Sequence, residues 1–536
     1  MNARRLWPLP LAAGLLGLSL APLPAGAQDA DTLRVYVVVV DGLNTEEVRL
    51  MPFLSSLAAQ GTHYPEARSV MIAETTPNHV AMVTGVYPDS SGIVANDFPD
   101  VETGERTGNG DPGQLEADSL FTLVEQQCPE LFTAAVTSKD YLFTVMDHDR
   151  TGDGEVDADS NFANLEHPTF LPPPAGLTPD ETTMTEARRV VREHDPDFLF
   201  VNLGAVDRSG HADPTGSLPL PTGERPVFRD TVRTITDTNL RLFVEELKAA
   251  GTWDSTALIV TADHSMDWSL PLDTVSLSSS FEADPLLAGE VIAAQNGGAG
   301  LYSLRDRSSP RAAERLARMR EIALATAGVD EALYRQPNPL DGGQAHWVGA
   351  VHPDWHQTHP RSGDLLVTVV DGRRVSEPSR TSNPIPGNHG MPSTLRIPMV
   401  VAGGAGLGVV QQRVDASPDP FVREVQSAEN VDVAPTAAWL LGVDPPEGGF
   451  DGRALEEAFG SRPEPTCVAA TGAEDPRPGS DGSGSDSGSD AGAGRPGSAA
   501  AAPGTSGSRL PATGPPLLLP LAGLALAAAV VATRRP

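Results

Sequence analysis

Apolar residues in this chain gather in five short runs that stand well apart from one another. Each run is nearly continuous, and most are rich in β-branched residues such as valine. Runs of this kind are typical of strands buried on both faces of a parallel sheet. We therefore predict strands over residues 33–40, 132–137, 197–203, 256–262 and 397–404.

Amphipathic stretches with helical spacing lie between these runs. Residues 46–60, 230–251 and 310–328 place apolar side chains three and four positions apart, and each stretch ends at or just before a glycine. Strands that alternate with helices indicate crossover connections. The pattern predicts an α/β fold with a largely parallel central sheet flanked by helices, with insertions.

The two ends of the chain have the composition of targeting segments. Residues 1–27 combine Arg4 and Arg5 with an apolar run and a small-residue site that ends at Ala27, which predicts a secretory signal peptide. Residues 510–536 contain "LPATG", an apolar stretch and two arginines. This order resembles the sorting signal of Gram-positive surface proteins, in which a sortase cuts between Thr513 and Gly514 and links the chain to peptidoglycan. An ordinary membrane span is the alternative.

A polar linker separates the sorting signal from the body of the chain. Residues 468–509 consist almost wholly of Gly, Ser, Ala, Pro and Asp, which cannot bury a core and predict a flexible stalk. The remaining residues, 28–467, contain no second linker and are interpreted as one large domain. The expected location is extracellular, with the chain anchored to the cell wall.

The net charge of the chain argues against one class of binding partner, nucleic acids. Its formal net charge is −33, and only two lysines, Lys139 and Lys248, are present. An acidic surface repels the phosphate backbone of nucleic acids, so no nucleic-acid polymer is expected as a partner. Cys128 and Cys467 both lie in the exported part, where a disulfide is permitted, although two free thiols remain the alternative.

Acidic and histidine residues follow several of the predicted strands. Ligands of open α/β sheets bind beyond the carboxyl ends of the strands. Three carboxylates and three imidazoles are enough for two three-ligand zinc sites, and two metals are the usual device for phosphoryl displacement. The candidate ligands are Asp41, Asp207, His211, Asp263, His264 and His389.

A threonine pair precedes Pro77 at the start of another predicted helix. Thr75 or Thr76 as a simple N-cap is the commoner role of such a residue. The same position gathers free backbone N–H groups around a bound anion, so a metal-activated hydroxyl at Thr75 would be a nucleophile with its anion site already built. His79 is placed to brace this turn.

Five motifs occur in the order found in the alkaline phosphatase superfamily: "VVVVDG", "ETTPNHVAMVTGVYPDSSGIVAN", "DRSGH", "TADHS" and "GNHG". They most resemble its type I phosphodiesterase/nucleotide pyrophosphatase branch, from residue 35 to about 390, and residues 431–455 are similar to the closing segment of the superfamily. The resemblance implies extracellular, metal-dependent hydrolysis of phosphodiester or pyrophosphate bonds in small substrates, through a phospho-threonine intermediate.

The resemblance also assigns roles to individual residues. It places the nucleophile at Thr75. It also implies that Asn96 and backbone N–H groups near Thr76 bind a phosphoryl oxygen. It implies two zinc ions, or similar divalent metals. One would be bound by Asp207, His211 and His389, and the other by Asp41, Asp263 and His264.

Two positions depart from the family pattern. Glu74 and Thr76 stand where a lysine and an aromatic residue commonly flank the nucleophile, so a preference for nucleotides does not follow. A phosphomonoesterase or a phospholipid-headgroup phosphodiesterase on the same metal core is the alternative. A catalytically decayed, wall-displayed binding protein is the alternative from a different class.

Three further signals are weaker. Residues 149–160 resemble a calcium loop, although a solvated acidic turn explains the same letters and Ser160 replaces the usual glutamate. For the four histidines in residues 346–359, we favour a structural role or a place at the rim of the substrate site over binding of a third metal. Lys139 follows a strand end and is a candidate for lining the pocket. The candidate calcium ligands are Asp149, Thr151, Asp153 and Asp157.

Overall fold

The computed structural model describes residues 32–467, and the predicted signal peptide, stalk and sorting signal, including Thr513 and Gly514, lie outside this part. Within the described part no helix is both long and apolar enough to cross a bilayer. The internal gaps in the description are residues 109, 140, 143–145, 164–178, 213–226, 271, 383–385 and 416–426.

An eight-stranded sheet forms the centre of the fold. The pairs that connect β8, β1, β7, β5 and β6 are all parallel, whereas β17 runs antiparallel to both of its neighbours. In spatial order the strands are β18 (Gln412–Arg413), β2 (Thr62–Arg68), β17 (Arg396–Gly403), β8 (Thr256–Thr261), β1 (Arg34–Val40), β7 (Phe198–Leu203), β5 (Thr133–Thr137) and β6 (Ser160–Ala163).

The hydrophobic pattern explains why these segments are central strands. Every residue of β1, β7 and β8 is buried, as expected for continuous apolar runs covered on both faces. Each of the five predicted strands is present within one or two residues of its expected bounds. The predicted fold class is therefore confirmed: a mixed α/β fold with a mostly parallel central sheet.

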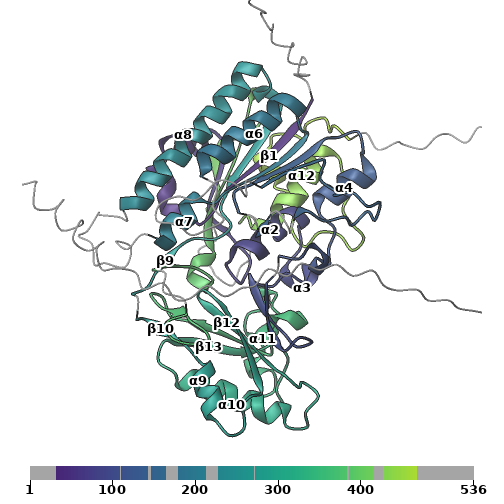
Figure 1. Cartoon of the computed structure of the whole chain (residues 1–536). Helices are drawn as coiled ribbons and strands as arrows, with labels where there is room; N and C mark the ends of the chain where they lie inside the picture. Colours follow the sequence, from purple (N-terminus) through teal and green to yellow (C-terminus); the bar gives the residue numbers. More distant parts are fainter. Residues whose placement is uncertain are drawn as a thin grey trace, which may run out of the picture. The chain divides into compact units, whose positions relative to one another are not determined.

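Helices cover both faces of this sheet. Figure 1 shows α6 and α8 on one side of β1 and α12 on the other, and α1 packs against α8. The helices that surround the sheet are α1 (Pro52–Gln60), α2 (Thr75–Thr84), α3 (Pro88–Ser91), α4 (Leu120–Gln127), α6 (Asp180–His194), α7 (Ala205–Ala212), α8 (Val227–Ala250) and α12 (Val433–Leu441).

One predicted helix is divided in two. The stretch 46–60 forms a 3₁₀ helix, η1 (Thr45–Leu50), followed by α1, with Met51 in an extended conformation between them. Pro52 causes the break, because proline lacks the N–H that a continuous helix needs and disfavours helical backbone in the residue before it. Proline suits the first position of α1, where that N–H has no partner in any case.

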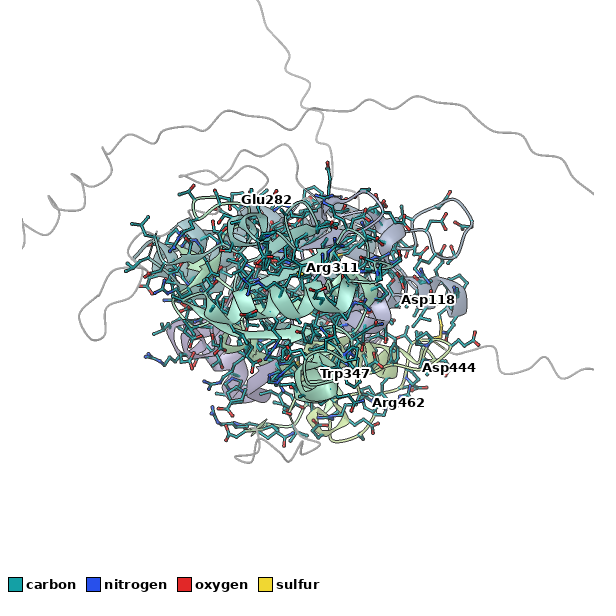
Figure 2. The ribbon with its side chains drawn as sticks, turned by 90° about the horizontal axis from the view of Figure 1, so that it is seen from below. Asp118, Glu282, Arg311, Trp347, Asp444 and Arg462 are labelled. Carbon is teal, nitrogen blue, oxygen red and sulfur yellow. A yellow bond between two sulfur atoms is a disulfide. The ribbon has the colours of Figure 1, made fainter. Side chains whose placement is uncertain are left out.

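A second, antiparallel sheet is the main feature that the hydrophobic pattern did not reveal. Its two inner strands are buried at every residue and its two outer strands are partly exposed. The helix predicted over 310–328 packs on it as α10. Figure 2 views the molecule from this side, with Arg311 at the start of α10 labelled. The elements are β11 (Val291–Asn296), β12 (Ala299–Leu304), β14 (Leu365–Val369), β13 (Val329–Tyr334), α9 (Ser278–Ala283), α10 (Ala312–Ala325) and α11 (Val348–Val351).

Cys128 and Cys467 form a disulfide, with their Cα atoms 5.7 Å apart. Cys128 follows α4, and Cys467 is the last described residue, so the bond closes a loop across 339 positions. The sulfur–sulfur bond is drawn in yellow in Figure 2. The bridge ties the end of the domain to the helices around the central sheet.

Removing this disulfide should lower the free energy of unfolding by about 3–5 kcal/mol, because a long closed loop restricts the unfolded chain strongly. We expect the double variant C128S/C467S to unfold at lower urea concentration than the wild type. Reduction of the wild-type protein should reproduce the loss, whereas reductant should not affect the double variant. A loss below about 1 kcal/mol would mean that the loop is already restricted in the unfolded state.

Candidate active site

The candidate site lies where four adjacent parallel strands end. The register aligns Val39 of β1 with Thr261 of β8 and Asn202 of β7, and Asn202 with Thr137 of β5. Because the strands are parallel and in register, the residues that follow them meet at one edge of the sheet. This edge holds Asp41 after β1, Asp207 in α7 after β7, Asp263 and His264 after β8, and Lys139 after β5.

Asp41, Asp263 and His264 form one group of candidate metal ligands. All three side chains are buried, and their ligand atoms lie within 4.8 Å of one another. The Nε2 atom of His264 is 3.2 Å from Asp263 Oδ2 and 3.7 Å from Asp41 Oδ1. The structure therefore brings together the three residues predicted for one metal.

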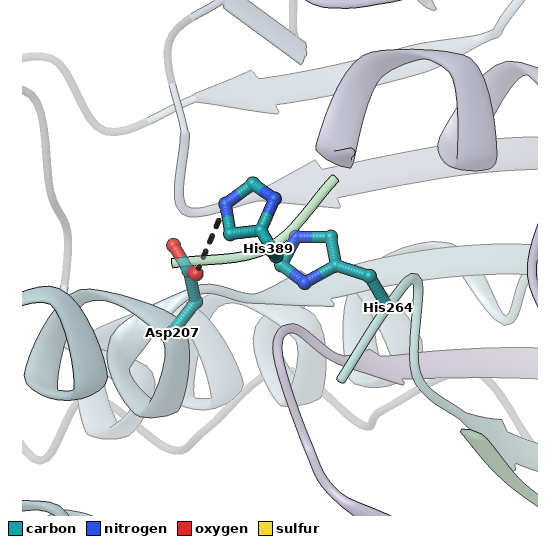
Figure 3. A group of neighbouring side chains, drawn as sticks. All are labelled: Asp207, His264 and His389. Carbon is teal, nitrogen blue, oxygen red and sulfur yellow. Dashed lines mark ion pairs between the residues drawn. The ribbon is translucent and has the colours of Figure 1, made fainter. Parts of the chain in front are cut away.

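Asp207, His211 and His389 meet beside this group. Asp207 Oδ1 is 3.2 Å from His211 Nε2 and 3.8 Å from His389 Nε2, and the two imidazole Nε2 atoms are 3.2 Å apart. His264 also lies within metal-binding range of Asp207 and His389 (Figure 3), and its ring stacks on that of His389 with centroids 3.7 Å apart. The two predicted ligand sets thus adjoin at His264.

Two glycines allow these segments to approach closely. Gly42 follows Asp41 with φ +73°, and a Cβ there would lie 3.0 Å from the Cα of Asp207. Gly387 precedes His389 by two residues, and a Cβ at that position would lie 2.3 Å from the carbonyl oxygen of Gly210. Larger residues at either position would push Asp207 or His389 out of the cluster.

The donor set fits divalent cations. Among the described residues, Asp207 Oδ1 and Asp263 Oδ2 are buried without a hydrogen-bond partner. A buried carboxylate oxygen without a partner is costly unless a cation or donor faces it. Mixed nitrogen and oxygen ligands without thiolates are those of catalytic zinc and similar metals.

Burial shifts the pKa values of the candidate ligands. Burial raises the pKa of Asp41 to about 6, with Asp263 adding to the effect, and burial also raises the pKa of Asp263 to about 6. Burial lowers the pKa of His264 to about 4 and that of His389 well below its usual value. At neutral pH the carboxylates are ionised and these imidazoles are neutral, which is the state that metal binding requires.

Thr75 is the first residue of α2, and Glu74 rather than Thr75 occupies the N-cap position without a side-chain capping bond. The hydroxyl of Thr75 is therefore not used as a cap. Its Oγ1 lies 3.4 Å from His264 Nε2, and the side chain is buried. The geometry favours the nucleophile interpretation over the N-cap interpretation of this threonine.

Asn96 lies beside Glu74 and Thr76, but one expected contact differs. The backbone N–H of Thr76 donates to Asn96 Oδ1 at 2.8 Å, so this N–H positions the asparagine and is not free to hold a phosphoryl oxygen. The backbone N–H of Asn96 donates to Glu74 Oε2 at 2.7 Å. Burial raises the pKa of Glu74 to about 8, so its carboxyl is mostly protonated at neutral pH. Glu74, one of the two departures from the family pattern, thus holds Asn96 in place.

His79 connects the turn at Thr75 to Asp41, a candidate metal ligand, through Asn202, in line with its predicted bracing role. Its Nδ1 is 2.8 Å from the carbonyl oxygen of Thr75, and its Nε2 is 2.9 Å from Asn202 Nδ2. Asn202 in turn donates to Asp41 Oδ2 at 2.9 Å. Sequence reasoning missed Asn202, because a single asparagine inside an apolar strand belongs to no recognisable motif.

Lys139 has a more central position than sequence reasoning assigned. Its ammonium donates to Asp41 Oδ1 at 2.8 Å, to Asp207 Oδ2 at 2.9 Å and to Thr75 Oγ1 at 3.0 Å. Burial alone would lower the pKa of Lys139, but the charges of Asp207 and Asp41 outweigh burial and raise it above its usual value. The signal available in the sequence was a lone lysine directly after a strand.

The candidate calcium loop is not among the metal-binding groups of the described residues. Asp149 accepts backbone N–H groups from Gly152 and Gly154, and Asp157 accepts from Arg150 and from the hydroxyl of Thr122. These carboxylates therefore serve local turns and an adjacent helix. Calcium binding by Asp149, Thr151, Asp153 and Asp157 stays a prediction.

The four clustered histidines are separated by their partners. Each lies near a different carboxylate, and His356 also stacks on Tyr87 with ring centroids 3.6 Å apart. This arrangement agrees with a structural role and not with a shared metal. The pairs are His346 with Asp341, His352 with Glu331, His356 with Asp89, and His359 with Glu116.

The curated proteins that match this chain include nucleotide pyrophosphatases/phosphodiesterases and a bis(5'-adenosyl)-triphosphatase. The chain is 26% identical to the bis(5'-adenosyl)-triphosphatase enpp4 of Xenopus laevis over 251 residues, which cover 44% of this chain and 48% of that protein. It is 24% identical to ectonucleotide pyrophosphatase/phosphodiesterase family member 3 of Mus musculus over 245 residues, which cover 44% and 25%. The chain spans about half or less of the length of these curated relatives.

Solved structures share the fold. Human ectonucleotide pyrophosphatase/phosphodiesterase 5 superposes with a TM-score of 0.58 at 15% identity, covering 79% of this chain and 98% of that one. An inactive variant of the murine protein in complex with AMP gives 0.58 at 16% identity, covering 80% and 98%. Phosphonoacetate hydrolase from Sinorhizobium meliloti 1021 in complex with phosphonoformate gives 0.53 at 19% identity, covering 76% and 95%.

The match to a protein family extends over most of the structure. Residues 35–392 match the family described as type I phosphodiesterase / nucleotide pyrophosphatase. The matched region begins in β1 and includes Thr75 and all six candidate ligands, the last of which, His389, lies three residues before its end. This chain belongs to the type I phosphodiesterase / nucleotide pyrophosphatase family, within the alkaline phosphatase superfamily.

Proposed function

We propose that this protein is a metal-dependent hydrolase that cleaves phosphodiester or pyrophosphate bonds of small substrates through a phospho-threonine intermediate. The observation that carries the proposal is the position of Thr75. Its hydroxyl lies at a helix N-terminus, 3.4 Å from His264, beside two groups of buried candidate metal ligands. The side chains that a covalent phosphoryl transfer would need thus lie within one cluster.

Family membership supports the class of reaction. One relative is named a bis(5'-adenosyl)-triphosphatase, and one structural neighbour holds AMP. Both names concern compounds that contain a phosphoryl group bound to a nucleoside. We extend only this chemistry, a small phosphate ester or anhydride, to the present chain.

The roles of the residues follow from their contacts. When bound, two divalent cations would supply Lewis-acid stabilisation of the phosphoryl oxygens and lower the pKa of the Thr75 hydroxyl. Asp41, Asp263 and His264 would hold one cation, and Asp207, His211 and His389 the other. Thr75 Oγ attacks phosphorus as the leaving oxygen departs, and water then breaks the threonine–phosphorus bond and restores the hydroxyl.

The remaining residues orient the reacting groups. Asn96 is held by two backbone contacts, so its side-chain amide is fixed beside the nucleophile, where it can donate to a phosphoryl oxygen. His79 and Asn202 hold the carbonyl oxygen of Thr75 and the carboxylate of Asp41 in one network. This rigidity keeps the attacking oxygen aligned.

A substrate panel with and without a chelator tests the proposal. We expect the zinc-loaded full chain to hydrolyse bis-p-nitrophenyl phosphate and a nucleoside p-nitrophenyl ester, and chelation to abolish both activities. Hydrolysis of p-nitrophenyl phosphate alone would instead support the phosphomonoesterase alternative. No turnover with any substrate at full metal occupancy would contradict the proposal and favour the binding-protein alternative.

We further propose that the protein acts outside the cell, anchored to the wall. The Cys128–Cys467 disulfide supports export, because such bonds persist in oxidising compartments. Cell fractionation should place the protein in the wall fraction, and substitution of Thr513 should release it from that fraction. Retention of the variant in the wall would contradict sortase anchoring.

Metal affinity should fall in acid because of the carboxylates. Metal binding requires Asp41 and Asp263 to be ionised, and their pKa values of about 6 lie well above the pKa of about 4 at His264. We expect zinc affinity, measured by competition with a chelator, to be nearly constant above pH 7. Below pH 6 it should fall by roughly tenfold per pH unit for each protonated ligand.

The onset of this fall identifies the groups responsible. If an imidazole set the limit at its ordinary pKa, affinity would begin to fall near pH 7, with a dependence of about one proton. That outcome would contradict the assignment of Asp41 and Asp263. The D263N variant is the matched control, since it should lose one proton from the pH dependence.

A further inference from the structure

The turn between β11 and β12 of the small antiparallel sheet (residues 296–299, the β11–β12 turn) lies against two parts of the candidate site. Asn296 is the last residue of β11, and only 1% of its surface is exposed. Its Oδ1 accepts the backbone N–H of Asp97 at 3.0 Å, and its Nδ2 donates to the carbonyl oxygen of Asp97 at 2.9 Å. Asp97 directly follows Asn96 and begins β3 (Asp97–Asp100). The amide of Asn296 therefore fixes the backbone next to Asn96.

The same turn also contacts the segment that carries His389. The backbone N–H of Gly298 donates to the carbonyl oxygen of His389. Gly297 has φ +58°, and a Cβ at this position would lie 2.0 Å from the same oxygen, so the two backbones are in direct contact. The β11–β12 turn thus touches both the backbone beside Asn96 and the backbone of a candidate metal ligand.

Apolar packing joins the small sheet to the segments around Thr75 and Asn96. One buried hydrophobic cluster contains three residues that precede Thr75, three residues around Asn96, and residues of all four strands of the small sheet. Ala73, Phe98 and Leu301 represent these three groups. Because close-packed side chains resist displacement, the small sheet supports both of these segments.

Asn96 is attached separately to the segment of Thr75. Its Oδ1 accepts the backbone N–H of Thr76, and its own backbone N–H donates to Glu74 Oε2. These bonds fix the asparagine relative to the proposed nucleophile. The bonds from Asn296 instead fix the next residue relative to the small sheet.

Packing alone does not account for the amide of Asn296. Apolar contacts have no preferred direction, whereas two hydrogen bonds to one residue fix its distance and its orientation. Without Asn296, the N–H and the C=O of Asp97 would have to find other partners, since a backbone group that is removed from water without a partner is costly. We expect the chain at Asn96 to move as a result.

We propose that Asn296 is a positioning residue of the reaction: through the backbone of Asp97, it holds the amide of Asn96 where that amide binds a phosphoryl oxygen. This inference rests on the proposed function and concerns the same site. The small antiparallel sheet is then part of the catalytic apparatus, because its β11–β12 turn contacts the segments of Asn96 and His389 together. A misplacement of about 1 Å in such a group can cost roughly 10²-fold in rate.

The test is a double-mutant cycle on the full, zinc-loaded chain, with bis-p-nitrophenyl phosphate as the substrate. Asn296→Ala removes both bonds to Asp97, Asn96→Ala removes the amide that these bonds are proposed to hold, and a third variant combines the two changes. We expect kcat/KM to fall by roughly 10- to 10²-fold in Asn296→Ala. If Asn296 acts through Asn96, the double variant should match Asn96→Ala within about threefold, because the two effects are then not additive.

Asn338→Ala is the matched control. Asn338 is buried beside the same small sheet, its Nδ2 donates to the carbonyl oxygen of Ala313 at 2.9 Å, and its Oδ1 accepts the backbone N–H of Leu340 at 3.0 Å. The control therefore also loses two bonds between an asparagine side chain and the backbone, but none of them involves Asn96 or its neighbours. Asn338→Ala should keep the kcat/KM of the wild type.

Binding of inorganic phosphate is a readout that does not depend on turnover. Zinc stoichiometry should stay at two in every variant, because none of the changes removes a candidate ligand. Inorganic phosphate should bind zinc-loaded Asn296→Ala more weakly than the wild type by roughly tenfold or more, as on loss of one hydrogen bond to a charged group. Asn338→Ala should bind phosphate as tightly as the wild type does.

Several results would overturn the inference. Additive losses in the double variant, or equal losses in Asn296→Ala and Asn338→Ala, would make Asn296 a structural residue only. Loss of zinc from Asn296→Ala would mean that the turn acts on His389 and not on Asn96, and a wild-type kcat/KM in Asn96→Ala would leave Asn296 with nothing to position.

Two further outcomes are kept distinct. If Asn296→Ala does not fold, Asn296→Asp takes its place in the cycle, since it keeps the acceptor for the N–H of Asp97 and loses the donor; the same non-additivity supports the inference, and additive losses overturn it. If the wild-type chain hydrolyses no substrate, the proposed function fails, whereas the phosphate affinities of Asn296→Ala and Asn338→Ala still decide whether Asn296 supports an anion site at Asn96.

Discussion

The Thr75→Ala variant should lose turnover by roughly 10⁴-fold or more while it still binds two metals, because it removes the proposed nucleophile and leaves the candidate metal ligands in place. Thr75 is not needed to complete either group of candidate ligands, each of which consists of carboxylates and imidazoles. We therefore expect kcat to fall without a matching change in zinc stoichiometry. Steady-state kinetics together with metal analysis measures both quantities.

A matched variant and a trapped intermediate make this experiment decisive. Thr75→Ser retains a hydroxyl at the start of α2 and should keep activity within about tenfold of wild type. Acid quenching of the wild-type reaction should leave a phosphorylated chain, detected by intact mass, and the Ala variant should show none. A variant that lacks the hydroxyl and turns over at a near-wild-type rate would contradict the phospho-threonine mechanism.

The Asp263→Asn variant should bind metal more weakly by roughly 10²-fold or more. Changing a residue that only supports a metal ligand costs about 10- to 100-fold in affinity, and loss of a ligand itself should cost more. Asp263 Oδ1 accepts the backbone N–H groups of Gly42 and His264 at 2.9 Å and 3.0 Å, and an asparagine oxygen can keep both bonds. The change therefore replaces only Oδ2, the oxygen that lies 3.2 Å from His264 Nε2 and has no partner among the described residues. We expect activity to fall with metal occupancy.

The same variant should be more stable than the wild type when metal is removed. Burial raises the pKa of Asp263 from 3.8 to about 6, so proton binding to the folded state stabilises it below pH 4, and this contribution is lost as pH rises through 6. At pH 7 the ionised group costs the metal-free protein about 3 kcal/mol, which asparagine avoids. Thermal unfolding after chelation should show a higher Tm for the variant at pH 7.5 and a small difference at pH 4.

An exposed aspartate provides the control for this comparison. Asp330 lies on β13 and is exposed, so Asp330→Asn removes the same charge far from the sheet edge that holds the ligands. It should change neither metal affinity nor the stability of the chelated protein. Equal behaviour of the two variants would mean that net charge, and not the buried position of Asp263, is responsible.

The sequence alone determined five of the eight strands of the central sheet and the candidate chemistry that follows them, whereas β2, β6 and β18 were not predicted. Continuous β-branched runs can be buried only as interior strands, and their carboxyl ends must meet at one edge when the strands are parallel. The residues after β1, β7 and β8 could therefore be assigned to one candidate site, and the resemblance carried by the order of motifs supplied Thr75 as the candidate nucleophile. The small antiparallel sheet was not predicted. Its outer strands β11 and β13 are partly exposed and carry a weak pattern, whereas its inner strands β12 and β14 are buried and were overlooked.

Only the tertiary structure decided how the charges of the site are shared. Lys139 follows β5, and no local pattern indicates that its ammonium reaches Asp41, Asp207 and Thr75, since that depends on the order of four strands in the sheet. The pairing of Cys128 with Cys467 likewise depends on where α4 lies relative to the end of the domain. Residue types and spacing specify which groups can react, whereas strand order and register decide which of them meet.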